Sequence, residues 1–519
     1  MSTALQSTVR AGARRPRSLR PRPLTWIALV IGIAGTAVSA TGSWIPSLWG
    51  DEAASVMSAQ RSIPSLFAML GHVDAVHGTY YLGLHFWIDL VGSDPFVMRL
   101  PSAFAIGGTA ALVTVIAGRL GSRRVAVAAG ILTCVLPRLT IAGSEVRSYA
   151  FSALVATLLT MLLVELISRE PRRRALWIAY SLVLAAGVYV FLYLALLVVV
   201  HGVVLLAMRM PRAFTMRWLR FAGIGIALGL PVLIAAVAER GQIAYLGHRP
   251  MVTPANVLVA PWFITIPFAA LSWVLIVCAG IAWFRGRRRP MPQRDGRMPR
   301  LDLLAAAWLL IPAVVLIGGY FLVPVYTPRY LTYCAPAAAI LIALGLDWLT
   351  GRKAWALLLS LAVVLGVAVP GYLAQRQPYA KNESDWAVIS AVVGAHARPG
   401  DAVAFDERTR PSRRPRLAMH TYPAGFAGLA DVTLDTPYWA GTSWHDTAYS
   451  IPKAAELGRL DGVVRLWLVE YSTPEHLDDH ELLALEGLGF TTSASYATHR
   501  SVIYELVRPA AAAAEPPSP

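Results

Sequence analysis

The chain has 519 residues, of which 56% are hydrophobic and only 15% are charged. This composition excludes a soluble globular protein and supplies far more apolar sequence than one membrane-spanning helix needs. The net charge of +16 does not indicate nucleic-acid binding, because the arginines cluster between apolar runs, where the retention of positive loops in the cytoplasm accounts for them equally well. We therefore expect a polytopic α-helical membrane protein in contact with membrane lipids, with no nucleic-acid partner.

The N-terminal segment 1–23 is rich in arginine and precedes an apolar run of about 18 residues, the pattern of a cytoplasmic tail followed by a first transmembrane helix. A signal peptide is the alternative interpretation, with Val38-Ser39-Ala40 as its cleavage site. The many apolar runs that follow favour an uncleaved helix.

Apolar runs of spanning length predict about eleven transmembrane helices within residues 24–373, at 24–43, 97–119, 124–142, 149–168, 175–191, 192–208, 219–238, 256–284, 302–323, 330–349 and 354–373. The continuous run 175–208 is too long for one span, so we divide it near Leu192. With this division, every basic cluster falls on the cytoplasmic side. The polar segments 44–96, 143–148, 239–255 and 324–329, and the chain from about residue 374, then face the opposite side.

The two longest extracytoplasmic segments have predicted structure. The first loop, 44–96, is semi-apolar, and its segments 63–67 and 80–87 predict short amphipathic helices on the membrane surface. The region 374–508 predicts a small α/β domain with strands at 401–405, 463–469, 491–496 and 502–507 and a helix at 481–488. The Ala- and Pro-rich tail 509–519 predicts disorder.

Two adjacent carboxylates, Asp51 and Glu52, follow the first span by only a few residues. Ionisable groups at a membrane boundary are costly to desolvate, which favours a functional role. The alternative is structural, since acidic residues stabilise a helix N-terminus and the following residues look helical. The pair by itself does not separate these two interpretations.

Further polar residues fall on the same predicted face of the membrane, and their convergence favours function. Acids can remove a proton or bind a metal, and arginines can hold a phosphate through two hydrogen bonds. The candidate substrate-binding residues are His77, Tyr80, Glu145, Arg147, Tyr149, Arg329 and Tyr330. Asp51, Glu52 and Glu145 are candidate ligands for a divalent metal, the one cofactor that we consider.

Five short motifs occur in a characteristic order: Asp51-Glu52, His77-Gly78-Thr79-Tyr80-Tyr81, Arg99-Leu100-Pro101-Ser102, Glu145-Val146-Arg147-Ser148-Tyr149-Ala150 and Pro328-Arg329-Tyr330-Leu331. Together they resemble the GT-C membrane glycosyltransferases, specifically the protein mannosyltransferase and aminoarabinose transferase-like group of glycosyltransferase family 39. The resemblance covers residues 24–372. It implies a GT-C fold of transmembrane helices with a large first external loop.

The resemblance also implies residue roles. The acidic residue of the first external loop, here Asp51 and with it Glu52, would be the catalytic base or would help to bind a metal. Arg147 and Tyr149 would face the active cavity, and Arg329 would contact phosphate. The family often has His-Pro-Pro where this chain has His77-Gly78-Thr79, so the role of His77 stays open.

The implied reaction is the transfer of a sugar of the mannose or arabinose type from a polyprenyl-phosphate donor to a glycan, lipid or protein acceptor. The phosphate is a good leaving group, so the reaction needs a carboxylate base, Asp51, and cations for the departing phosphate, but no general acid. A single displacement inverts the anomeric centre. The Arg- and Ala-rich composition indicates a bacterial protein. From the apolar runs and the distribution of positive charge we expect it in the plasma membrane, with a cytoplasmic N-terminus and an extracytoplasmic C-terminal domain.

Two other functions would use a similar membrane scaffold. A transporter or flippase of lipid-linked sugars should show broken helices in corresponding halves of the chain, and the sequence shows no such symmetry. A membrane-anchored assembly protein would instead bind cell-wall glycan through its C-terminal domain.

Overall fold

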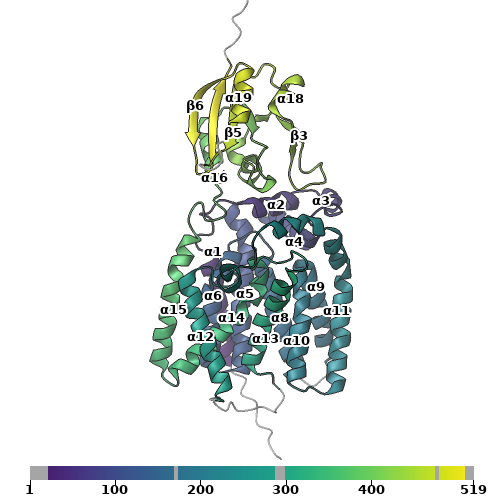
Figure 1. Ribbon diagram of the computed structural model, residues 1–519, viewed down its shortest axis with the longest axis vertical. Helices are drawn as coiled ribbons and strands as arrows, with labels where there is room; N and C mark the ends of the chain where they lie inside the picture. The colour runs from purple at the N-terminus through teal and green to yellow at the C-terminus, as the bar shows by residue number, and fades with distance from the viewer. Residues whose placement is uncertain (1–21, 169–172, 287–297, 474–478, 509–519) are drawn as a thin grey trace, which may run out of the picture.

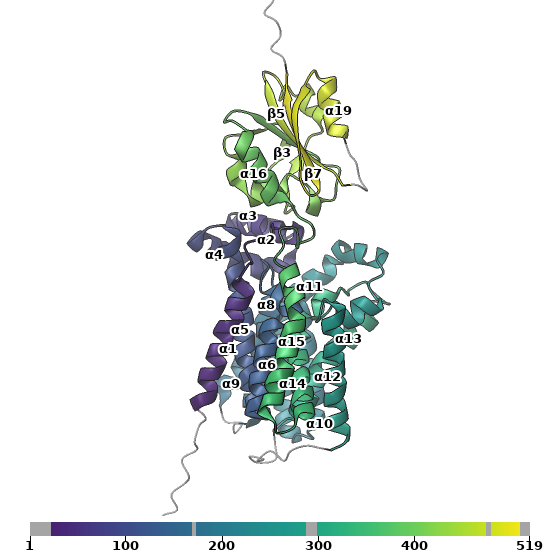
Figure 2. The ribbon, with the colours of Figure 1, turned by 90° about the vertical axis from the view of Figure 1, so that its left-hand side faces the viewer.

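The computed structural model of the protein describes residues 22–168, 173–286, 298–473 and 479–508. The predicted N-terminal tail, except for its last two residues, and the predicted C-terminal tail lie outside the described residues. A helical bundle forms one part of the molecule, and a smaller part containing a β-sheet stands on one end of it (Figures 1 and 2). The short helices of the first loop lie between the two parts.

Each apolar run that the sequence assigned to a span contains helical structure. The helical segments of the bundle are α1 (Arg22–Ala40), α5 (Pro95–Leu120), α6 (Arg123–Val135), α7 (Pro137–Ala142), α8 (Tyr149–Ser168), α9 (Arg174–Val190), η2 (Leu192–Ala195), α10 (Leu196–Ala207), α11 (Arg212–Ala238), η3 (Arg240–His248), η4 (Ala255–Val259), α12 (Ile266–Phe284), α13 (Leu301–Gly319), η5 (Pro328–Cys334), α14 (Ala335–Thr350) and α15 (Ala354–Ala374). Within the described residues, seven helices are long and apolar enough to cross a membrane. The count of about eleven spans therefore remains a prediction.

Several predicted spans are interrupted, and local backbone chemistry explains two of the breaks. The run 124–142 divides into α6 and α7 because Pro137 has no N–H to continue the first helix. The run 256–284 begins with a single turn, η4, and α12 starts only after Ile264, which has a φ of 64°. The run 175–208 breaks at Phe191, whose extended backbone separates α9 from η2 close to the division expected at Leu192.

The bundle has a buried centre and an apolar surface. Helix α14 is buried along most of its length, whereas α11 and α15 are mostly exposed. Large apolar side chains such as Ile234 and Leu358 are exposed on these outer helices. Such a surface suits contact with lipid rather than with water.

The first loop folds into α2 (Gly50–Ala59), α3 (Ile63–Leu70), η1 (Ala75–His77) and α4 (Gly78–Val91). Helices α3 and α4 contain the segments 63–67 and 80–87 that the sequence predicted as helical. Helix α2 lies directly beneath the sheet-containing part (Figure 1). Nearly all of its residues are buried, because protein covers it on both sides.

The C-terminal region forms a mixed five-stranded sheet in the order β2-β1-β5-β7-β6. Strands β2, β1 and β5 pair in parallel, and β5, β7 and β6 pair antiparallel. Its elements are α16 (Trp386–His396), β1 (Ala402–Phe405), η6 (Pro411–Arg413), α17 (Leu417–Thr421), η7 (Pro423–Phe426), β2 (Ala430–Asp431), β3 (Leu434–Thr436), β4 (Thr447–Ala448), α18 (Ile451–Glu456), β5 (Arg465–Tyr471), α19 (His480–Gly487), β6 (Thr491–Ala497) and β7 (Ser501–Val507). The prediction of a small C-terminal α/β fold is confirmed.

Helices α12 and α14 approach so closely that the substitution Gly345→Ala should disrupt their packing. A Cβ atom at Gly345 would lie 2.0 Å from the main-chain oxygen of Leu275, which cannot move without the helix. We expect a loss of about 1–3 kcal/mol of stability, the usual cost of overpacking. The measurement is the melting temperature of the detergent-purified protein. The control is Gly280→Ala, where nothing lies within 4 Å of the new methyl group, and equal melting of both variants would contradict the prediction.

Candidate active site

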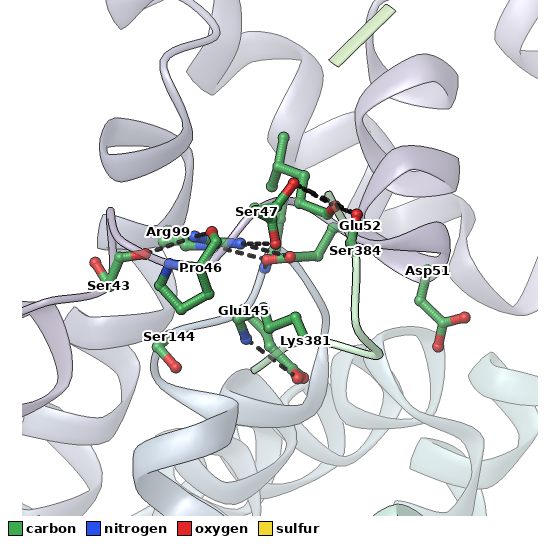
Figure 3. Close-up of polar contacts among 12 residues, drawn as sticks. Ser43, Pro46, Ser47, Asp51, Glu52, Arg99, Ser144, Glu145, Lys381 and Ser384 are labelled. Atoms are coloured by element: carbon green, nitrogen blue, oxygen red, sulfur yellow. Dashed lines mark hydrogen bonds and ion pairs between the residues drawn. The ribbon is translucent and has the colours of Figure 1, made fainter. Parts of the chain in front are cut away.

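Helix α2 turns its two adjacent carboxylates toward different surroundings. An α-helix has 3.6 residues per turn, so neighbours along the chain point about 100° apart and residues four apart share a face. Asp51 and Ser55 lie on the face that meets Arg147 and Arg329. Glu52 lies on the face toward Arg99. The two adjacent carboxylates therefore belong to separate networks, and Figure 3 shows Asp51 directed away from Glu52.

The Asp51 carboxylate forms an ion pair with Arg329 from η5. Arg147, from the segment between α7 and α8, donates to the main-chain oxygen of Asp51 at 3.1 Å and to Ser55 Oγ at 3.2 Å. Its other terminal nitrogen lies 3.3 Å from Nε2 of His77. The side chains of Asp51 and Arg329 remain 23% and 27% exposed, so the ion pair is within reach of a ligand.

The charges of this cluster fix its protonation states. Burial alone would raise the pKa of the Asp51 carboxyl, but Arg329 and Arg147 together hold that pKa below its ordinary value. Burial and the charge of Arg147 lower the pKa of His77 to about 3. At neutral pH Asp51 is therefore ionised, and His77 is neutral and can accept a hydrogen bond from Arg147 through Nε2.

Glu52 forms a fully buried ion pair with Arg99 of α5. Arg99 donates through Nε to Oε1 at 2.9 Å and through Nη2 to Oε2 at 2.6 Å, and the N–H of Val146 donates to Oε1 at 2.9 Å. Arg99 also donates to the main-chain oxygens of Ser43 and Pro46, at 2.5 and 2.9 Å (Figure 3). Because both oxygens of Glu52 already accept hydrogen bonds, this geometry favours a positioning role for Glu52 over the catalytic role that the sequence suggested.

Glu145 belongs to a third ion pair. Its carboxylate lies 3.3 Å from Nζ of Lys381, which comes from the segment after α15. Burial lowers the pKa of Lys381, against the raising effect of Glu145 and Glu52. Figure 3 shows this pair beside the Glu52–Arg99 pair and apart from Asp51. Glu145 thus joins the C-terminal region to the bundle and does not face the Asp51 cluster.

The three candidate metal ligands do not form a common site. Asp51, Glu52 and Glu145 each pair with a different cation, Arg329, Arg99 and Lys381. Among the residues that the structure describes, no three His, Cys, Asp or Glu side chains are grouped so that they could hold a metal ion. The residues present therefore do not fit the predicted ligand set.

The aromatic candidates divide in the same way. The guanidinium of Arg329 lies 5.9 Å from the ring of Tyr149 and 5.7 Å from the ring of Trp49, within range of cation–π attraction. Tyr330 packs instead against Tyr193, with ring centroids 5.2 Å apart. Tyr80 packs against Phe151, with centroids 6.0 Å apart. The structure therefore brings Tyr149 to the Arg329 side chain.

Sequence reasoning overlooked three residues of these networks. Trp49 beside Arg329 and Ser55 beside Arg147 had only their closeness to Asp51 as a signal. Lys381 lies in a polar segment after the last predicted span, where a lysine is ordinarily solvated. No local pattern reveals that this segment folds back onto the bundle.

Removing one member of the buried pair should be far more damaging than removing both. The substitution Arg99→Met leaves Glu52 as an unpaired buried carboxylate, which should lower stability by about 3–5 kcal/mol. The double variant Glu52→Leu/Arg99→Met removes both charges and should regain part of that loss. Melting curves of the purified proteins measure both effects. A single variant as stable as the parent would show that the pair is not needed.

Comparisons with known proteins add structural similarity but no sequence match. No protein-family model matches the chain, and neither does any curated protein sequence. The structure resembles that of ArnT from Cupriavidus metallidurans bound to undecaprenyl phosphate, with a TM-score of 0.54, 15% identity, and coverage of 92% of this chain and 98% of ArnT. The apo form of ArnT gives a TM-score of 0.54 at 14% identity, with coverage of 92% and 97%.

The arabinofuranosyltransferase AftD from Mycobacteria aligns with 93% of this chain and 40% of its own, at 16% identity and a TM-score of 0.47. The likeness to ArnT, an aminoarabinose transferase, spans both the helical bundle and most of the C-terminal region. The chain therefore has the fold of the GT-C membrane glycosyltransferases, as the order of its sequence motifs implied.

Proposed function

We propose that this protein is a membrane glycosyltransferase that moves a sugar from a polyprenyl-phosphate donor to a hydroxyl group of an acceptor, with Asp51 as the base. The observation that carries the proposal is the ionised, partly exposed Asp51 carboxylate at the end of the helical bundle, paired with Arg329, with Arg147 bound to the main-chain oxygen of the same residue. The likeness to a protein solved with undecaprenyl phosphate supports a lipid phosphate as part of the donor.

The reaction needs both members of the Asp51–Arg329 pair. As the acceptor oxygen bonds to the anomeric carbon, its proton passes to Asp51. The bond from that carbon to the phosphate oxygen breaks, and its electron pair leaves with the polyprenyl phosphate. Arg329 and Arg147 stabilise the added negative charge. One displacement of this kind inverts the anomeric centre.

Donor binding would also activate the base. Without a ligand, Asp51 is the partner of Arg329, which keeps the pKa of the carboxyl low and makes it a weak base. An incoming phosphate competes for the guanidinium, because arginine binds phosphate through two parallel hydrogen bonds. As Arg329 turns to the phosphate, the pKa of Asp51 rises, and the carboxylate becomes a better proton acceptor.

The neighbouring residues have supporting roles. His77, being neutral, accepts a hydrogen bond from Arg147 and thereby orients it. Trp49 and Tyr149 each lie within cation–π range of the guanidinium of Arg329 and help to orient it. Glu52 and Glu145 fix the surrounding backbone through Arg99 and Lys381, and we assign no metal-dependent step to them.

The setting of the reaction follows from the charge distribution of the sequence. We place the protein in a bacterial plasma membrane with its Arg-rich N-terminus in the cytoplasm. The Asp51 cluster then lies at the extracytoplasmic side, where a glycan, lipid or protein of the cell envelope can serve as acceptor. The donor sugar is of the mannose or arabinose type.

The substitution Asp51→Asn should lower kcat by about 10²–10⁴-fold, because the amide cannot take up the acceptor proton. The measurement is sugar transfer by the purified protein from labelled polyprenyl-phosphate mannose and arabinose to envelope extracts. Asp89→Asn is the matched control, since that side chain is 66% exposed and lies on α4 away from the cluster. Full transfer by Asp51→Asn would refute the assignment. If the native protein moves donor across vesicles but transfers no sugar, a flippase is favoured.

The substitution Arg329→Gln should shift the acidic limb of the kcat/KM profile, which reports the donor-free protein, to higher pH. A base works only when deprotonated, so activity is lost as the pH falls through the pKa of Asp51. In the native protein Arg329 keeps the pKa of Asp51 low. Without Arg329, burial raises that pKa against a weaker opposing charge, so the pKa increases. The check is a pH–rate profile beside that of Arg212→Gln, an exposed arginine at the start of α11. An unmoved acidic limb would contradict the role of Asp51.

A further inference from the structure

We infer that the C-terminal α/β region positions Asp51 by holding helix α2 along its whole length, with Ser384 and Tyr422 as positioning residues. The inference rests on the proposed function, because it assigns a role relative to the catalytic base. It differs from the glycan-binding role considered from the sequence. The contacts that carry it are largely buried and involve α2 itself and the residues that flank it on both sides.

The C-terminal region binds the segment just before α2. The N–H of Leu48 donates to Tyr422 Oη at 2.8 Å, and the carbonyl of Leu48 accepts from Ser384 Oγ at 2.6 Å. Leu48 is fully buried and stands three residues before Asp51. The C-terminal region thus holds both the N–H and the carbonyl of Leu48, and so fixes the position at which α2 begins.

The first residue of α2 contacts the same region without space for a side chain. A Cβ atom on Gly50 would lie 2.4 Å from the main-chain oxygen of Ser412, in η6. Only glycine permits this approach of two backbones. The residue directly before Asp51 is therefore clamped against the C-terminal region.

The middle of the helix forms part of the core of the C-terminal region. Ala53 and Met57, one turn apart, are fully buried in one apolar cluster with Trp386, Phe405 and Leu417. These two side chains lie on the face of α2 that turns away from the bundle. Their burial resists rotation of α2 about its own axis, since rotation would expose them.

The end of the helix is fixed by the loop between β3 and β4. Tyr438 donates to Gln60 Oε1 at 3.3 Å. Arg61 is fully buried and donates to the carbonyl of Gly441 at 2.9 Å and to that of Ser443. A buried arginine bound to loop carbonyls leaves the loop little freedom to move away from α2.

These contacts bear on catalysis because they leave one face of α2 for the site. The bundle holds the Glu52 face, the C-terminal region holds the Ala53 face, and Asp51 projects toward Arg329. A displacement of a catalytic group by about 1 Å can cost about a hundredfold in rate. Loosening the hold on Leu48 or Gly50 should therefore lower kcat while the donor still binds.

Two variants test this inference by different routes. The double substitution Tyr422→Phe/Ser384→Ala removes both hydrogen bonds to Leu48, and Gly50→Ala inserts a methyl group between α2 and Ser412. The controls are Tyr504→Phe, on β7 in another apolar cluster, and Gly83→Ala, on α4 with nothing within 4 Å of the new methyl group. Kinetics, pH–rate profiles and hydrogen exchange are measured on the full-length protein in detergent.

We expect both test variants to lower kcat at least about tenfold, with the KM for donor nearly unchanged. The acidic limb of the kcat/KM profile should move to higher pH as Asp51 separates from Arg329 in the donor-free protein, which partial unfolding alone would not cause. Amides 48–53 should exchange about tenfold faster, the change that one lost hydrogen bond produces. Both controls should match the native protein in all three measurements.

Three results would overturn the inference. Native exchange at amides 48–53 in both variants would show that the C-terminal region does not hold α2. Faster exchange with native kcat and pH profile would show that the hold does not position Asp51. A loss of activity accompanied by faster exchange throughout the sheet would reveal only general unfolding. If the native protein transfers no sugar, the proposed function fails, and the positioning role fails with it even where the exchange result supports the hold.

Discussion

The arrangement of the site depends on the buried ion pair between Glu52 and Arg99. Burying two charged side chains away from water costs free energy, so a buried ion pair is stable only when its hydrogen-bonding groups have partners. Here Arg99 satisfies the carboxylate and the carbonyls of Ser43 and Pro46, while Val146 supplies another donor. One arginine thus joins α5, α2 and the loop after α1, and the carboxylate draws in the segment that carries Arg147. Because separating this buried pair would leave unpaired charges, the pair fixes the position of α2, the helix that bears Asp51.

Adjacent residues with the same functional group acquire opposite properties in this structure. Glu52 is sealed between bundle and loop with both oxygens engaged, whereas Asp51 remains partly exposed beside Arg329. The helical turn of about 100° between neighbours is enough to place a fully buried carboxylate next to a partly exposed one. The Asp51–Arg329 pair is therefore accessible to solvent, and the Glu52–Arg99 pair is not.

The C-terminal region is part of the same construction. It contributes Lys381 to the pair with Glu145, Ser384 and Tyr422 to Leu48, and an apolar cluster to Ala53 and Met57. Helix α2 is consequently almost entirely shielded from solvent. A helix of 10 residues is short for stability in isolation, so its orientation comes from the packing on both sides.

Amino-acid order alone predicts the membrane class and the helical character of the apolar runs, and it contains the motifs that resemble those of the GT-C fold. These features depend on local composition and on order along the chain, which long apolar runs and flanking arginines display directly. It also indicated that Asp51, Arg147 and Arg329 belong together. The folded structure is needed to see that Glu52 pairs with Arg99, that Glu145 turns to Lys381, and that the C-terminal region covers one face of α2. These pairings join residues that are far apart in the sequence. Glu52 and Arg99 are separated by 47 positions, and Leu48 and Ser384 by 336. A local motif or hydrophobic pattern cannot predict contacts over such separations.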